Sequence, residues 1–450
     1  MTESGVCRPD DFRTGFAGLA AVLLGGFGRA GYEFRPHGSV RAPDWDTTLF
    51  VSGGIQNWRS WVLGSHAAGA GRVGAQWCVR ANRLDDIGTS MALTSFCMIS
   101  AVRLGARSRR ETLEELMAAL EECGIPLSRL AFITTAPAAG RLSDEESADT
   151  LAAMGVSSDR IAARAHRWAQ PFRPCGPTGP NLFVLAEIGP PCSARCSPLC
   201  RCGRFLHFWN CEFLDYARLP DGTLQRAPRP VADSAGSLEW LACAVAGEPG
   251  ITGAEPLRRA ADAVLALVAR AAPGPDVAAA ELTKLVDHGR TVALLLASGL
   301  EPGPRAHAHV LRRLVRRMLT TLVALGAEPA LLSPVILAAS EASADQYGFP
   351  GVLDVRDRVR RLDDEGAGFT AAVARGRREY ARACERAGTA ADLAEALFRI
   401  KAERGVPLPV LLGWCRADGR EVCGERIATL LADERDVSRH GPAEGGRNMT

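Results

Sequence analysis

The chain has 450 residues, of which 47% are hydrophobic and 23% charged, and its 53 basic side chains nearly balance 51 acidic ones. This composition predicts a folded protein of two or three domains and excludes a chain that binds polyanions through its overall charge. Any nucleic-acid contact must therefore come from a local basic patch.

The N-terminal segment MTESGVCRPDDF lacks the basic start and apolar run of a signal peptide. The nearby run FAGLAAVLLGGFG is too short and too rich in glycine to span a bilayer. The 14 cysteines, in a long chain without a secretion signal, favour thiols or metal ligands over a disulfide framework. We therefore expect a cytoplasmic protein without a membrane partner.

Short apolar runs bounded by glycine and proline predict strands in the first half of the chain. These runs are 47–54, 75–81, 130–137, 181–188 and 204–216. Helical spacing of apolar residues predicts helices over 108–125 and 143–155, the second with Ser143 as its N-cap.

The amino-acid composition changes after about residue 250, where segments rich in alanine, leucine and arginine show helical periodicity. The predicted helices are 255–272, 278–299, 305–326 and 390–405. We expect a domain over 1–250, a helical domain over 251–435 and a disordered tail over 436–450.

The predicted helix 305–326 carries a basic strip. Its arginines lie on one side, and Leu311, Leu314, Val315 and Met318 point inward. Such a strip can grip a phosphate backbone, although a solvated helix face is the alternative. The strip consists of Arg312, Arg313, Arg316 and Arg317.

A cysteine cluster lies in the stretch CSARCSPLCRC. Four thiolates this close can satisfy one tetrahedral Zn²⁺, so we expect a structural metal site, with free loop thiols as the alternative. The ligands would be Cys192, Cys196, Cys200 and Cys202, with Cys175, Cys211 and His207 in reserve.

In order along the chain, these segments resemble the catalytic and tRNA-recognition domains of the alanyl-tRNA synthetase family. DTTLFVSGGIQNW is similar to D-P-T-L-L-F-T-N-A-G-M-N-Q-F, and CRCGRFLHFWNCEFLDY to C-x-C-G-R-F-x-E-I-W-N-x-V-F-M-Q. VADSAGSLEWL resembles V-D-T-G-M-G-L-E-R-L, and LVDHGRTVALLLASG resembles I-A-D-H-I-R-A-x-x-F-L-I-x-D-G. The resemblance implies an α+β fold: a class II synthetase antiparallel sheet flanked by helices, followed by an all-α domain.

The resemblance also implies site residues. Arg80 matches an arginine that holds the α-phosphate, and Asp233 matches the acid that anchors the alanine ammonium, so both are candidate catalytic residues. Trp209, Asn210 and Gly236 complete the expected alanine pocket.

Several of the family's cations and polar groups are missing. Met91 stands in its R-H-H segment, and Trp240 replaces the arginine that clamps the γ-phosphate. Pro304 replaces an asparagine that reads the acceptor stem, and proline has no polar side chain to present to a base.

Three functions remain open. The first is transfer of alanine from Ala-tRNA or alanyl-adenylate to a small adenosine-like nucleoside in specialised metabolism, such as antibiotic biosynthesis. The second is ATP- and Mg²⁺-dependent alanine–tRNA ligation, and the third is a non-catalytic protein that binds tRNA or a synthetase. The losses favour transfer, because one missing positioned charge costs ~10²–10³ in rate.

Overall fold

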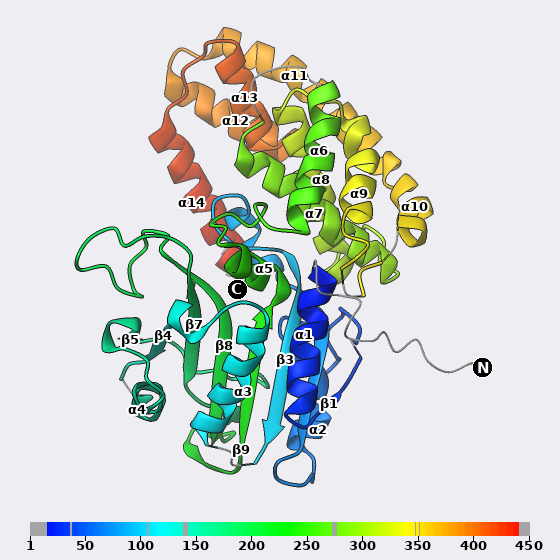
Figure 1. The fold of residues 1–450 in the computed structure, drawn as a ribbon. Coiled ribbons are helices and arrows are strands. Elements are labelled where there is room, and N and C mark those ends of the chain that lie inside the picture. The colour runs from blue at the N-terminus through cyan, green and yellow to red at the C-terminus, as the bar shows by residue number, and fades with distance from the viewer. Residues whose placement is uncertain are drawn as a thin grey trace, which may run out of the picture.

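The computed structural model describes residues 16–36, 38–105, 108–137, 143–271, 277–346, 348–350 and 352–440. A nine-stranded sheet occupies the first half, and helices occupy the second (Figure 1). The expectation of an α+β fold is confirmed.

The sheet has the strand order β1-β2-β3-β9-β8-β7-β4-β5, and β6 pairs with β8. Only the β1–β2 and β4–β5 pairs are parallel; the other pairs are antiparallel. The strands are β1 (Tyr32–Phe34), β2 (Gly71–Val79), β3 (Ser95–Leu104), β4 (Leu130–Thr135), β5 (Ile161–Arg164), β6 (Gly176–Thr178), β7 (Asn181–Glu187), β8 (Phe205–Arg218) and β9 (Leu224–Ser237).

Helices cover one face of this sheet. They are α1 (Phe16–Arg29), α3 (Arg109–Glu122) and α5 (Leu238–Ala246), which pack on the central strands (Figure 1). Every residue of β3 is buried, as a central strand covered on both faces requires. The opposite face lies under two loops, around residues 46–56 and 167–173, and under the short helices η2 (Gly54–Trp58) and α2 (Arg59–Leu63).

Two local expectations are corrected by the structure. Of residues 47–54, predicted as a strand, 47–53 form a loop with one isolated bridge between Arg41 and Phe50, because Gly53 caps η2 and Gly54 begins it. Helix α4 (Glu145–Ala153) is capped by Asp144 and not by Ser143, since the Asp144 carboxylate accepts from the backbone N–H of Ser147 at 3.4 Å.

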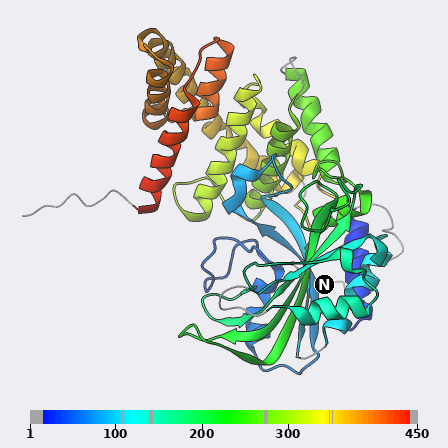
Figure 2. The same cartoon turned by 90° about the vertical axis from the view of Figure 1, so that its left-hand side faces the viewer.

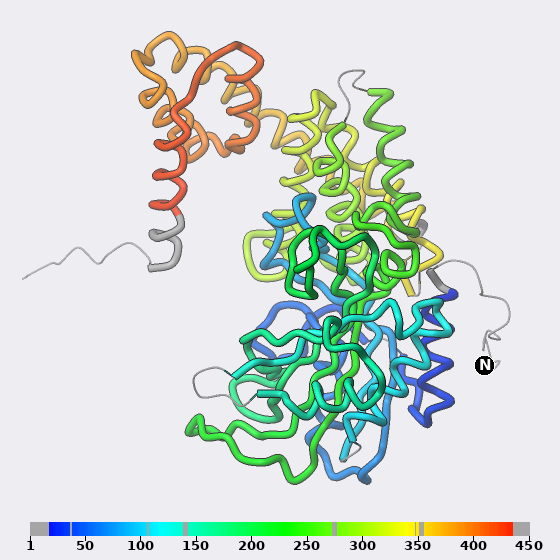
Figure 3. The backbone as a smooth tube through the Cα atoms, turned by 60° about the vertical axis from the view of Figure 1, so that its left-hand side comes forward, coloured from blue at the N-terminus to red at the C-terminus, as the bar shows by residue number. Residues whose placement is uncertain are grey.

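The second half consists of helices stacked against the end of the sheet, with the last four forming an outer lobe (Figures 2 and 3). They are α6 (Leu257–Ala271), α7 (Ala279–Ala297), α8 (Ala306–Ala324), α9 (Leu332–Glu341), α10 (Val352–Arg360), α11 (Asp363–Arg386), α12 (Ala390–Arg404), α13 (Leu408–Ala417) and α14 (Gly424–His440). None of the described helices is long and apolar enough to cross a bilayer. Helix α14 extends into the segment expected to be disordered, and the rest of that segment lies outside the described residues.

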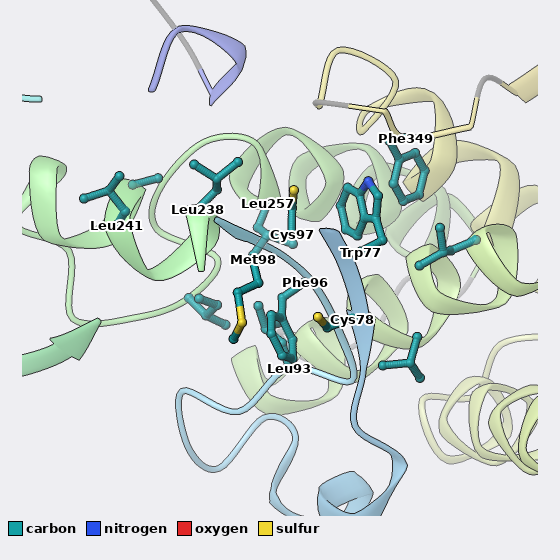
Figure 4. Close-up of a cluster of buried hydrophobic side chains, with 14 of the residues drawn as sticks. Trp77, Cys78, Leu93, Phe96, Cys97, Met98, Leu238, Leu241, Leu257 and Phe349 are labelled. Atoms are coloured by element: carbon teal, nitrogen blue, oxygen red, sulfur yellow. The ribbon is translucent and has the colours of Figure 1, made fainter. Parts of the chain in front are cut away.

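Buried side chains join the sheet to the helices. Trp77 and Cys97, from β2 and β3, lie in one cluster with Leu257 of α6 and Phe349, whose ring centroid is 5.1 Å from that of Trp77 (Figure 4). The two halves therefore share one hydrophobic core, while the expected domain boundary near residue 250 stays a prediction.

Candidate functional site

A cavity of about 510 Å³ opens on the face of the sheet that α1, α3 and α5 do not cover. Strands β7, β8 and β9 supply its floor, and the two loops supply its walls. Its polar lining includes Ser52, Arg80, Arg167, Trp168, Arg173, Asn181, Asn210, Glu212 and Asp233.

The floor is acidic. Glu212 and Asp233 are directly opposite each other on β8 and β9. Burial raises the pKa of Asp233 well above its usual range, and the neighbouring Glu212 raises it further. Burial also raises the pKa of Glu212 to about 7, against the opposing effect of Arg80. Ionisation of both neighbouring carboxyl groups is unfavourable unless a cation lies between or beside them.

Two oxygen atoms at this floor have no hydrogen-bond partner within the described part of the chain. They are Asp233 Oδ1 and Asn181 Oδ1, and both are buried. A buried acceptor without a partner costs about 1–3 kcal/mol, so a ligand that donates hydrogen bonds here is favoured. A protonated amine suits this floor in charge and in hydrogen bonding.

Arg80 places a cation in another part of the same cavity. Arg80 donates from Nη2 and Nε to the backbone oxygen of Ser52, at 2.7 and 3.1 Å, and its guanidinium lies 4.7 Å from the ring centroid of Phe96. Burial lowers its pKa, but an arginine stays cationic at neutral pH. Because Arg80 and the acidic floor line one cavity, the site suits a ligand with an ammonium and an anionic group.

Trp240 lies beyond Phe96. The centroids of their rings are 5.3 Å apart, and the indole Nε1 donates to the backbone oxygen of Met91 at 2.8 Å. Its one donor is therefore already used, and the side chain carries no charge. Trp240 does not line the cavity, so its correspondence to the phosphate clamp of the resembling family stays a prediction.

The structure places two of the expected pocket residues behind the cavity wall. Trp209 is 1% exposed on the helix-covered face, where its Nε1 donates to Ser234 Oγ at 2.9 Å. Gly236 lies opposite it on β9 and leaves room for the indole. Neither residue lines the cavity, so a contact between either one and a substrate stays a prediction.

Gly236→Ala should destabilise the fold, because an added Cβ would lie 2.1 Å from Trp209 Cε3. Such overpacking typically costs about 1–3 kcal/mol in the free energy of unfolding, which urea denaturation measures. Gly250→Ala is the matched control, since a Cβ there meets nothing within 4 Å. Equal stability of the two variants would show that the indole moves aside freely.

The four arginines of the basic strip differ in their contacts. Arg317 on α8 pairs with Asp85 at 2.8 Å and donates to the backbone oxygen of Leu84 at 2.7 Å, so it fastens α8 to η3 (Ala81–Asp86), the short helix after β2. Arg316 lies 4.0 Å from Glu365. Among the described residues, Arg312 and Arg313 have no ion-pair partner, which leaves them for an external anion.

The four cysteines of the cluster come together. Their sulfur atoms all lie within 4.8 Å of one another, with Cys192 and Cys200 at 3.5 Å and Cys196 and Cys202 at 3.7 Å. A set of four thiols at such distances fits one tetrahedral ion. Of the reserve ligands, Cys211 is buried in the core beside Ser234, and neither Cys175 nor His207 belongs to the described cluster.

The lining residues that sequence reasoning missed include Glu212, Asn181 and Trp168. The signal for Glu212 was present, because side chains two apart on a strand share a face and Asn210 was already expected in the site. Trp168 lies on a loop whose position no local pattern predicts.

Comparison with known proteins identifies the family of the chain. A family model described as tRNA synthetases class II (A) matches residues 24–449. The chain is 28% identical over 312 residues to an alanine–tRNA ligase of Treponema denticola, covering 67% of the chain and 52% of the relative. It is 26% identical to those of Treponema pallidum and Mycolicibacterium smegmatis, covering 90% and 93% of the chain and 69% and 48% of the relatives. The chain thus spans about half the length of two of these three relatives.

Proposed function

Because the chain belongs to the class II tRNA synthetase (A) family, we propose that it is an alanyl-tRNA synthetase-like transferase. It moves alanine from Ala-tRNA or alanyl-adenylate onto a small adenosine-like nucleoside in specialised metabolism. The observation that carries the proposal is Asp233 Oδ1, which is buried at the cavity floor without a hydrogen-bond partner among the described residues and can accept from an amine. The resemblance supports it, because it aligns the uncharged Trp240 with the arginine that clamps the triphosphate.

The transfer balances without ATP. The bond between the acyl carbon and the donor's oxygen breaks, and a bond forms between that carbon and a nitrogen of the acceptor. The proton of the attacking nitrogen passes to the leaving oxygen. The protein's part is to hold the ammonium at Asp233 and Glu212 and an anionic group at Arg80, since positioning alone can supply several kcal/mol of a reaction barrier, on the order of 7–11 in favourable cases.

Two assays on one preparation test the proposal against its alternatives. The first is alanine-dependent ATP–pyrophosphate exchange, and the second is transfer of labelled alanine from Ala-tRNA to 5′-O-sulfamoyladenosine. Transfer without exchange is the expected result. Exchange at ordinary synthetase rates would instead identify an ATP-dependent ligase, and silence in both assays would identify a binding protein.

We propose that the cysteine cluster holds a structural Zn²⁺ and that Arg312 and Arg313 contact tRNA. Elemental analysis of the purified protein should give about one equivalent of zinc, and Cys196→Ser should lower both zinc content and melting temperature. Cys384→Ser is the control, because Cys384 on α11 lies outside the cluster. Zinc below about a tenth of an equivalent would contradict the metal site.

The acidic floor predicts a pH dependence. The pKa of Glu212 is about 7 in the folded chain against an ordinary value of 4.5, so the folded state binds a proton that the unfolded state has lost. Stability from this group is present below pH 4.5 and is lost as the pH rises to about 7. The unfolding free energy of the unmodified protein should fall relative to that of Glu212→Gln by roughly 2 kcal/mol between pH 5 and 8. Parallel urea-denaturation profiles of the two proteins would contradict the raised pKa.

A further inference from the structure

A second cavity, of about 300 Å³, lies beside the first on the same face of the sheet. The sheet supplies one side of it and the cysteine loop, residues 198–203, supplies the other. Among the described residues, its lining contains no carboxylate but three aromatic rings and two arginines: Phe183, Phe205, His207, Arg164 and Arg201.

The two cavities are joined through neighbouring residues. The distance between Nε2 of His207, which lines the second cavity, and Oδ1 of Asn210, which lines the first, is 2.7 Å. On β7, Asn181 lines the first cavity and Phe183 lines the second. A molecule in the second cavity would therefore lie next to the ligand of the first.

The aromatic rings form one cluster. The ring of Phe183 lies 4.8 Å from that of His207, with an edge-to-face angle of 86°, and 4.6 Å from that of His166. Leu199, on the cysteine loop, lines the same cavity and is 43% exposed. A planar ring that enters between the loop and the sheet would cover these apolar surfaces.

The arginines supply the charge. Arg164 lies 5.6 Å from the ring centroid of Phe183, and Arg201 lines the cavity from the loop. Both side chains are exposed, and neither has an ion-pair partner among the described residues. Aromatic rings beside unpaired arginines are the combination that binds single-stranded nucleotides, in which a base stacks and a phosphate meets a cation.

We propose that the second cavity is a nucleotide subsite, with a base against Phe183 and His207 and a phosphate beside Arg164 and Arg201. The inference rests on the proposed transfer function, because transfer between two nucleosides requires both in one active site and the first cavity accounts for one. The nucleotide is either the unpaired 3′ end of tRNA or a free nucleotide, which share this chemistry.

Binding assays test the subsite without relying on transfer. The probes are the RNA trinucleotide CCA, the dinucleotide CC and AMP. Phe183→Leu keeps an apolar side chain but removes the ring, and it should weaken binding of the occupant about tenfold. Arg201→Gln should weaken it severalfold and reduce the slope of log affinity against log salt by about 0.7. Arg195→Gln is the control, since Arg195 lies exposed just before this loop, between Cys192 and Cys196, but does not line the cavity.

The probes distinguish the two sources. Binding of CCA that depends on Phe183 and exceeds that of CC and AMP would identify the tRNA end, whereas equal binding of AMP would identify a free nucleotide. If Phe183→Leu and Arg201→Gln bind CCA and AMP as the Arg195→Gln control does, the subsite is wrong. Probe binding that depends on Phe183 in a protein without transfer activity would refute the proposed function and leave the subsite standing.

Discussion

Asp233→Asn is expected to reduce strongly the preference of this protein for an alanyl over a propionyl ligand, because the amide keeps an acceptor oxygen but loses the negative charge that pairs with the ammonium. Asp233 Oδ1 is buried at the cavity floor without a partner, and a hydrogen bond from an ammonium to such an oxygen is worth about 1.5–3 kcal/mol. The loss corresponds to roughly 10- to 100-fold in affinity. The measurement is calorimetric titration with the alanyl sulfamate of adenosine and with its propionyl counterpart, which lacks the amino group.

Two features of the design separate binding from folding. Burial raises the pKa of Asp233, which disfavours its charged form, and an amide has nearly the shape of a carboxyl group, so the asparagine variant should fold as well as the unmodified protein. Asp221→Asn is the matched control, because Asp221 lies in the exposed turn between β8 and β9, where its carboxylate accepts from Thr223. If Asp233→Asn still prefers the alanyl ligand tenfold or more, the ammonium does not bind at this floor.

Arg290→Met is expected to lower the free energy of unfolding by about 3–5 kcal/mol, because it leaves the charge of Glu239 buried without its partner. The two side chains are fully buried, and Arg290 Nη2 lies 2.9 Å from Glu239 Oε1. Arg290 belongs to α7 and Glu239 to α5, so the pair fastens the helices of the second half to the sheet. Gln346 Oε1 accepts from the same Nη2 at 2.7 Å.

A double-mutant cycle identifies the cause of this loss. Glu239→Gln combined with Arg290→Met removes both charges, so the double variant should lose markedly less stability than the sum of the two single variants. Equilibrium denaturation of the four proteins gives the coupling energy. If Arg290→Met alone lowers the free energy of unfolding by less than about 1 kcal/mol, the ion pair contributes little to stability.

The fold was largely predictable from the sequence because it depends on local periodicity and on motif order. The apolar runs at 130–137, 181–188 and 204–216 became β4, β7 and β8, and the predicted helices of the second half became α6, α7, α8 and α12. The prediction of a strand at 47–54 is wrong, because the glycines of this stretch favour a loop. Its apolar content alone does not distinguish a strand from a loop.

The site was less predictable, because its contacts join distant segments. The resemblance placed the stretch LVDHGR in the helical domain but gave its side chains no role; in the structure Asp287 accepts from the backbone N–H of Thr94 at 2.7 Å and Arg290 pairs with Glu239. These residues dock α7 on the sheet. Similarly, the resemblance led to Trp209, whereas strand geometry brought Glu212 and Asn181 into the cavity.

The most direct test of transfer is an ATP-free reaction of the purified protein with alanine-labelled Ala-tRNA and 5′-O-sulfamoyladenosine. If the protein is a transferase, label leaves the tRNA and appears, in equal amount, in an alanyl nucleoside. Asp233→Asn should form far less of this product, and Asp221→Asn should form as much as the unmodified protein. Label that stays on the tRNA, or appears only as free alanine, would contradict the proposed transfer.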